Sequence, residues 1–65
     1  MWTVVYIAPH KKAAEKLKDV LMREGLLVQL RPVGLPHDKG AMEVLVPESE
    51  AEEALEIIIE NVGVR

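Results

Sequence analysis

The sequence predicts an α+β fold, a two-layer sandwich in which two helices cover one face of a three-stranded sheet. Three short segments are rich in β-branched and aromatic residues, which is typical of strands. Two longer segments carry apolar residues at the roughly 3.6-residue spacing of an amphipathic helix. Their order along the chain is strand, helix, strand, strand, helix. With 65 residues the chain has the size of one small domain, and we expect residues 1–65 to fold as a single unit.

The first predicted strand is Trp2–Ala8, because β-branched and aromatic side chains suit a pleated surface. Pro9 ends this strand, since proline has no N–H to donate to a neighbouring strand. Helical spacing follows over residues 10–24, with alanine, leucine and valine on one face and mostly charged residues on the other. Gly25 stands where helices commonly end in a residue with a left-handed backbone.

The second predicted strand covers residues 26–33, whose side chains alternate between apolar and polar over most of its length. Pro32 restricts the far end of this strand to a sheet edge or a bulge. The connection 34–41 is dense in turn residues and leads into the third strand, 42–46, which stops at Pro47. The second and third strands therefore form a hairpin and run antiparallel.

The second helix is predicted over residues 50–62. Ser49 and Glu52 form a capping-box pattern, in which each side chain accepts a hydrogen bond from a backbone N–H near the helix start. The run 57–59 consists of three isoleucines, and its two outer members either widen the core face or dock another chain. The apolar residues at helical spacing, expected to form the core face, are Ala51, Ala54, Leu55, Ile58 and Val62.

The connections limit the sheet topology. A helical crossover makes the first and second strands parallel, and the right-handed crossover is strongly preferred. The hairpin makes the third strand antiparallel to the second. Placing the third strand in the centre satisfies both conditions, as in a split βαβ unit, and leaves both helices on one face of the sheet.

The opposite face of the sheet is then uncovered, and the Trp2–Ala8 strand is apolar on both sides. Strict alternation puts Trp2, Val4 and Tyr6 on one side and Val5 and Ile7 on the other. Exposed apolar patches and open strand edges usually mark interaction sites, so we predict self-association through this face or edge. The alternative is a patch that a monomer tolerates. The predicted interaction surface consists of Trp2, Val4, Tyr6 and Leu45.

Charge is unevenly distributed along the chain. Residues 1–40 carry seven of the eight Lys/Arg and four acids, a net +3, whereas residues 41–65 carry Arg65 and seven glutamates, a net −6. Either the two charged faces are solvated and attract each other within the fold, or each meets a partner of opposite charge. We expect no nucleic-acid partner, because the chain is acidic overall and only Trp2 and Tyr6 could stack on bases.

The chain contains no cysteine, which excludes disulfides and thiolate metal sites and favours a cytoplasmic location. Its apolar stretches are far shorter than the roughly 20 residues that span a bilayer, so we expect no membrane partner. The first residues lack the basic region of a signal peptide. Small chains without such covalent or metal cross-links often gain burial by self-association, which favours a homodimer.

Catalytic motifs are absent from the sequence, which contains no Walker loop, GxGxxG, HExxH or GxSxG pattern. The glutamates of the second helix, Glu52, Glu53, Glu56 and Glu60, are expected on its solvated side. Acid–base catalysis would instead need a buried carboxylate with a shifted pKa. We therefore predict a protein that is not an enzyme and holds no cofactor.

Two histidines follow strands that end at the same edge of the predicted sheet, His10 after the first strand and His37 after the second. Together with Asp38 they could converge on a metal ion. The central third strand separates their backbones by about 10 Å at the usual spacing between strands. We therefore expect exposed loop histidines and no metal site.

A basic edge is the remaining candidate site. Lys11 and Lys12 lie in the first turn of the first helix, where free N–H groups and the positive end of the helix dipole attract anions. Arg31 and Lys39 belong to the same edge of the sheet. The alternative function is thus a sensor that binds a small anion or a nucleotide there. Otherwise these are ordinary surface lysines that aid solubility.

Several segments together resemble one known family. They are residues 5–8 (VYIA), 14–18 (AEKLK), 24–26 (EGL), 43–48 (EVLVPE) and 53–57 (EALEI). The family consists of small prokaryotic signal-transducing proteins of uncharacterised function, which resemble part of the ferredoxin-like fold of the nitrogen-regulatory PII proteins. The resemblance covers nearly the whole chain and implies a βαββα fold, a regulatory or binding role and no catalytic residues. We therefore predict a non-enzymatic interaction or regulatory module that acts through an apolar sheet face or edge.

Overall fold

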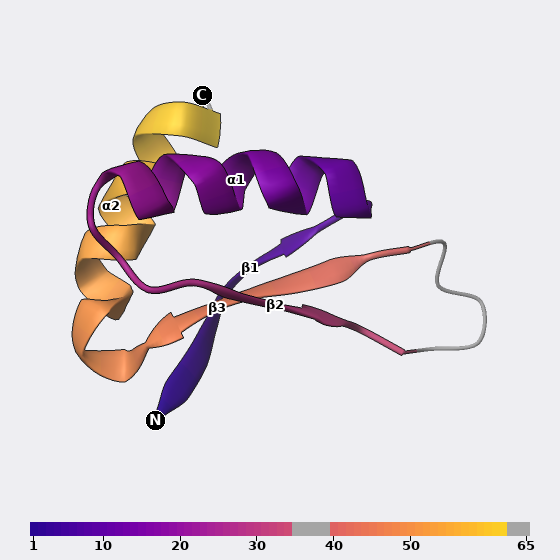
Figure 1. Ribbon diagram of the computed structural model, residues 1–65, viewed down its shortest axis with the longest axis horizontal. Coiled ribbons are helices and arrows are strands. Elements are labelled where there is room, and N and C mark those ends of the chain that lie inside the picture. The colour runs from indigo at the N-terminus through magenta and orange to yellow at the C-terminus, as the bar shows by residue number, and fades with distance from the viewer. Residues whose placement is uncertain (35–39, 63–65) are drawn as a thin grey trace.

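The computed structural model describes residues 1–34 and 40–62. Its three strands form one sheet in the order β1-β3-β2, and both strand pairs are antiparallel. The predicted α+β fold with a central third strand is therefore confirmed (Figure 1). In chain order the elements are β1 (Trp2–Ala8), α1 (Lys11–Arg23), β2 (Gln29–Pro32), β3 (Met42–Pro47), the 3₁₀ turn η1 (Glu48–Glu50) and α2 (Ala51–Val62).

Both helices pack on the same side of the sheet, and the hydrophobic core lies between the two layers. Figure 1 shows α1 above the strands and α2 beside it at one end of the sheet. Val44 and Val46 of the central strand are fully buried beneath the helices. The buried core residues are Ala8, Ala14, Leu17, Leu21, Leu26, Val44, Val46, Ala54, Ile57 and Ile58.

Helix α1 is closed at both ends by local hydrogen bonds. At its start the Nδ1 atom of His10 accepts a hydrogen bond from the backbone N–H of Ala13 at 3.2 Å. At its end Gly25 adopts the predicted left-handed backbone, with φ of +88°. The N–H of Leu26 then donates to the carbonyl of Leu21 at 3.2 Å, and both side chains are buried together in the core. This is a Schellman motif with its usual apolar contact.

The predicted second strand is shorter than expected, because β2 pairs with β3 only over Gln29–Pro32. The preceding backbone makes other bonds: the N–H of Leu26 caps α1, and the N–H of Leu27 donates to Oε1 of Glu50 at 3.1 Å. The predicted alternation nevertheless holds. Leu26 is buried, Val28 and Leu30 pack against the core, and Gln29 and Arg31 are exposed.

The start of the second helical segment differs from the prediction. Pro47 takes the cap position without a side-chain hydrogen bond, and Ser49 lies inside the η1 turn. The predicted capping box of Ser49 and Glu52 is therefore wrong. A tertiary contact fixes this end instead, because the N–H of Glu48 donates to the carbonyl of Met1 at 2.7 Å.

Helix α2 turns its apolar residues in two directions. Ala54 and Ile58 are buried as predicted, and Ile57 joins them, so this isoleucine widens the core face. Leu55, predicted in the core, is 44% exposed, and Ile59 is 55% exposed. The buried stripe is rotated because α2 also packs against α1, which draws the flank with Ile57 inward.

A β-bulge in β1 sets which of its side chains face the helices. Val4 lies opposite Leu45, whereas Tyr6 lies opposite Val44, so Val5 has no partner of its own. Residues opposite one another in a ladder point to the same side of the sheet. Because Val44 faces the helices, Tyr6 does too, and both Val5 and Tyr6 pack against the core.

The bulge corrects one sequence expectation. Strict alternation predicted Tyr6 on the outer side of the sheet, beside Trp2 and Val4. The extra residue shifts the alternation by one position, so Tyr6 points to the helices and Ile7 points outward, where it is 57% exposed.

Candidate functional site

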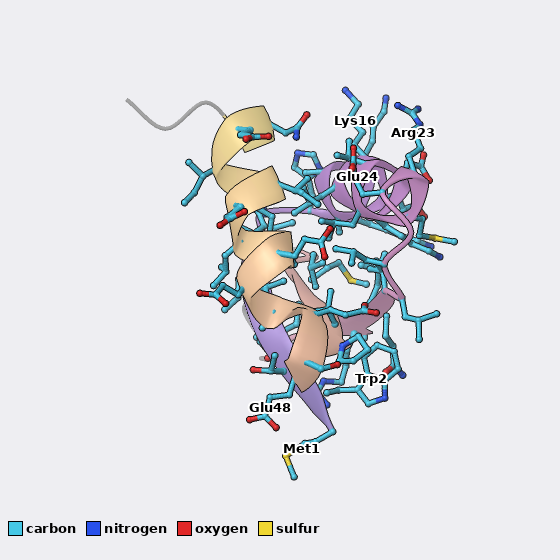
Figure 2. All side chains as sticks on the ribbon, turned by 90° about the vertical axis from the view of Figure 1, so that its left-hand side faces the viewer. Met1, Trp2, Lys16, Arg23, Glu24 and Glu48 are labelled. Carbon is cyan, nitrogen blue, oxygen red and sulfur yellow. The ribbon has the colours of Figure 1, made fainter. Side chains whose placement is uncertain are left out.

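The outer face of the sheet carries an apolar patch that the helices do not cover. We define the outer patch as Trp2, Val4 and Ile7 of β1 with Leu45 of β3. The three β1 side chains are 39–57% exposed. Figure 2 shows Trp2 on the side of the sheet opposite α1. Leu27, two residues before Gln29, extends the exposed apolar surface toward β2.

Leu45 occupies the centre of this patch and differs from its prediction. It lies on the expected side, but only 4% of its surface is exposed, and it is not part of the core beneath the helices. Its direct neighbours across the sheet are Val4 and Gln29. These flanking side chains cover Leu45, so the surface available to a partner is formed chiefly by β1.

The other end of the outer face carries two charged side chains. Arg31 and Glu43 lie opposite each other on β2 and β3, and Nε of Arg31 donates to Oε1 of Glu43 at 2.7 Å. Ile7 completes this cross-strand row on β1. The outer face therefore divides into an apolar half at the start of β1 and a mixed half at its end.

The two outer strands of the sheet differ in how they resist further pairing. β2 has only four residues, one of which is the charged Arg31 and one Pro32, and all three features discourage another strand from adding. β1 has seven residues without a charge or an internal proline. Its bulge at Val5 is the only such device along it. Within the described part of the chain, β1 is the more open edge.

The predicted basic edge is not assembled among the described residues. Lys11 and Lys12 are exposed at the start of α1, on the helix side of the sheet. Arg31 lies on the outer side and is already paired with Glu43. Lys39 falls outside the described residues. The structure therefore brings together Lys11 and Lys12, adjacent in sequence, and separates them from Arg31.

The histidines do not meet in the described structure. His10 uses Nδ1 to cap α1, while His37 and Asp38 fall outside the described residues. In the described ranges, 1–34 and 40–62, no three His, Cys, Asp or Glu side chains are grouped to hold a metal ion. The glutamates of α2 named above, Glu52, Glu53, Glu56 and Glu60, are exposed.

A cleft between the two helices was missed by the sequence analysis. It has a volume of about 320 Å³ and is lined by residues of β1, α1 and the end of α2. Tyr6 reaches it only because of the bulge, and no local pattern marks that bulge in the sequence. The lining residues are Tyr6, Ala13, Lys16, Leu17, Val20 and Asn61.

Among the described helices, none has the length and apolar character needed to cross a membrane. Comparisons with known protein families, with curated proteins and with solved structures found no match to this chain. The resemblance to the small signal-transducing family thus stays a prediction.

Proposed function

We propose that this protein is a non-enzymatic interaction module that self-associates through the outer patch and the adjacent edge of β1. The observation that carries this proposal is the exposure of Trp2, Val4 and Ile7 along one strand that is itself a sheet edge. An apolar patch next to unpaired backbone groups suits a protein partner. A regulatory role agrees with the family resemblance, and a cytoplasmic location agrees with the absence of cysteine.

The free energies of burial and association indicate that a dimer needs both the outer patch and the β1 edge. Complete burial of one large apolar side chain is worth about 1.5–3 kcal/mol, and these side chains are about half exposed. Three such residues from each of two copies therefore contribute at most about 6 kcal/mol, and less where their contact in the dimer is only lateral. Association costs about 4–15 kcal/mol in lost translational and rotational freedom. Backbone hydrogen bonds between two β1 edges supply what the patch alone lacks.

Strand β1 is also suited to a second copy of itself. Two β1 strands related by a two-fold axis run antiparallel, and each exposes the same unpaired N–H and C=O groups. Because β1 carries no charge, the pairing brings no like charges together along the strands. The two outer patches would then lie side by side on one continuous sheet.

Sedimentation velocity across a wide concentration range tests this proposal. We expect the wild-type chain to form a dimer as its concentration rises and Val4→Lys to stay monomeric, because the lysine places a charge between Trp2 and Ile7 on the exposed β1 part of the patch. Met22→Lys is the matched control, since Met22 is an exposed apolar residue on α1, away from the outer face. A wild-type chain that stays monomeric up to millimolar concentration would refute self-association.

A further inference from the structure

The cleft combines apolar walls with a few polar groups at its margin. Ala13, Leu17 and Val20 lie three or four residues apart on α1 and form one apolar wall. The small side chain of Ala13 leaves space that a larger residue would fill. At about 320 Å³ the cleft is at the lower end of the range for small-molecule sites, roughly 300–1,000 Å³.

The bulge in β1 brings a phenol to this cleft. If β1 alternated regularly through Val4, Val5 and Tyr6, the side chain of Tyr6 would point to the outer face; the bulge at Val5 turns it to the helix side instead. Bulges are common beside functional sites, where they redirect a side chain. Here the redirected side chain is the only tyrosine of the chain, and its hydroxyl can both donate and accept a hydrogen bond.

Two further polar groups reach the cleft from the helices. Lys16 lines the cleft from the exposed side of α1, and Figure 2 shows its side chain extending away from the sheet into solvent. Its flexible stem lets the ammonium group reach a ligand at the opening. Asn61 of α2 donates from Nδ2 to the carbonyl of Ile57 at 2.8 Å, which fixes its amide and leaves Oδ1 as an acceptor. None of the six lining residues is acidic, so the cleft favours an anion over a cation.

We propose that this cleft binds a small carboxylic acid with an apolar body, such as an aryl or branched alkyl acid. The carboxylate would pair with the ammonium group of Lys16 and accept a hydrogen bond from Tyr6. The apolar body would pack against Leu17 and Val20, in the space beside Ala13. This site is on the helix side of the sheet, separate from the outer patch, and the proposal does not depend on self-association.

Titration with 3-phenylpropionate, followed by the backbone amide shifts of the ¹⁵N-labelled chain, tests the proposal. We expect saturable shifts concentrated at the cleft, with a Kd on the order of 1 mM for so small a ligand. The neutral amide, 3-phenylpropanamide, has the same shape and should bind about 3- to 10-fold more weakly, because it cannot pair with Lys16.

Two variants locate the binding site. Lys16→Gln should weaken binding of the acid about 3- to 10-fold and leave binding of the amide unchanged. Arg23→Gln is the matched control, because it removes one positive charge from the same helix outside the cleft and should bind both probes as the wild type does.

Ala13→Leu should abolish binding of both probes by filling the cleft, and Val20→Phe serves the same purpose if the first variant fails to fold. Three results would overturn the proposal: no saturable shifts with the wild type, equal binding of acid and amide, or unchanged binding in a folded Ala13→Leu or Val20→Phe variant. Each would leave the proposal for the outer patch unaffected.

Discussion

The two faces of the sheet carry the same kind of apolar side chain but differ in how deeply they bury it. On the helix side Val44 and Val46 are fully buried under α1 and α2. On the outer side Val4 and Ile7 are as apolar but remain exposed around Leu45. The burial that stabilises the fold is thus concentrated on one face. The other face contributes less to that burial, so substitutions there should leave the fold intact.

The same substitution on the two faces gives the largest expected contrast. Val44→Ala removes two buried methyl groups and leaves a cavity, which should cost about 2 kcal/mol of unfolding free energy. Val4→Ala should lower the unfolding free energy of the monomer by less than about 1 kcal/mol, because Val4 is partly exposed and loses chiefly its cross-strand contact with Leu45. Urea unfolding at low protein concentration measures both. Since a chain of 65 residues has only about 3–10 kcal/mol of stability, the first loss is large. Equal losses would show that the two faces do not differ.

Deletion of Val5 should remove the bulge from β1. Tyr6 already lies opposite Val44, so the strand can close into a regular ladder with its register on both sides kept. We expect a folded variant, destabilised by about 1 kcal/mol through loss of one partly buried valine. Contacts between the Tyr6 ring and the core, detected by nuclear Overhauser effects, should persist. Their loss together with a slipped register would contradict this account of the bulge.

The mixed half of the outer face should contribute least to the free energy of unfolding. Arg31 is well exposed in its ion pair with Glu43, and exposed pairs are typically worth about 0.2–1 kcal/mol. Arg31→Gln should therefore lower the unfolding free energy by about 0.5 kcal/mol, and added salt should shrink the difference between variant and wild type. A loss that salt leaves unchanged would indicate that Arg31 acts through packing rather than charge.

Local signals in the sequence predicted most of the fold. Gly25 marked the end of α1 because few other residues adopt a left-handed backbone, and the helical crossover with the hairpin placed β3 in the centre. Trp2 and Val4 were predicted on the outer face, where the structure places them.

Features that depend on tertiary contacts were not predicted from the sequence. The bulge at Val5 follows from the register between β1 and β3, so strict alternation placed Tyr6 on the wrong face and hid the cleft. The hydrogen bond from the N–H of Leu27 to Oε1 of Glu50 joins residues 23 positions apart, and no local pattern predicts it. Leu55 fits the helical spacing, but the packing of α2 against α1 rotates it out of the core.

The strand order also bears on how the chain acquires its structure. β1 and β2 pair only with β3, so the first two-thirds of the chain contains two strands that have no ladder to join. During synthesis neither strand can form its ladder with β3 until residues 42–47 have left the ribosome. We therefore expect the nascent chain to gain its sheet in one late step, with β3 as the template on which both neighbours fold.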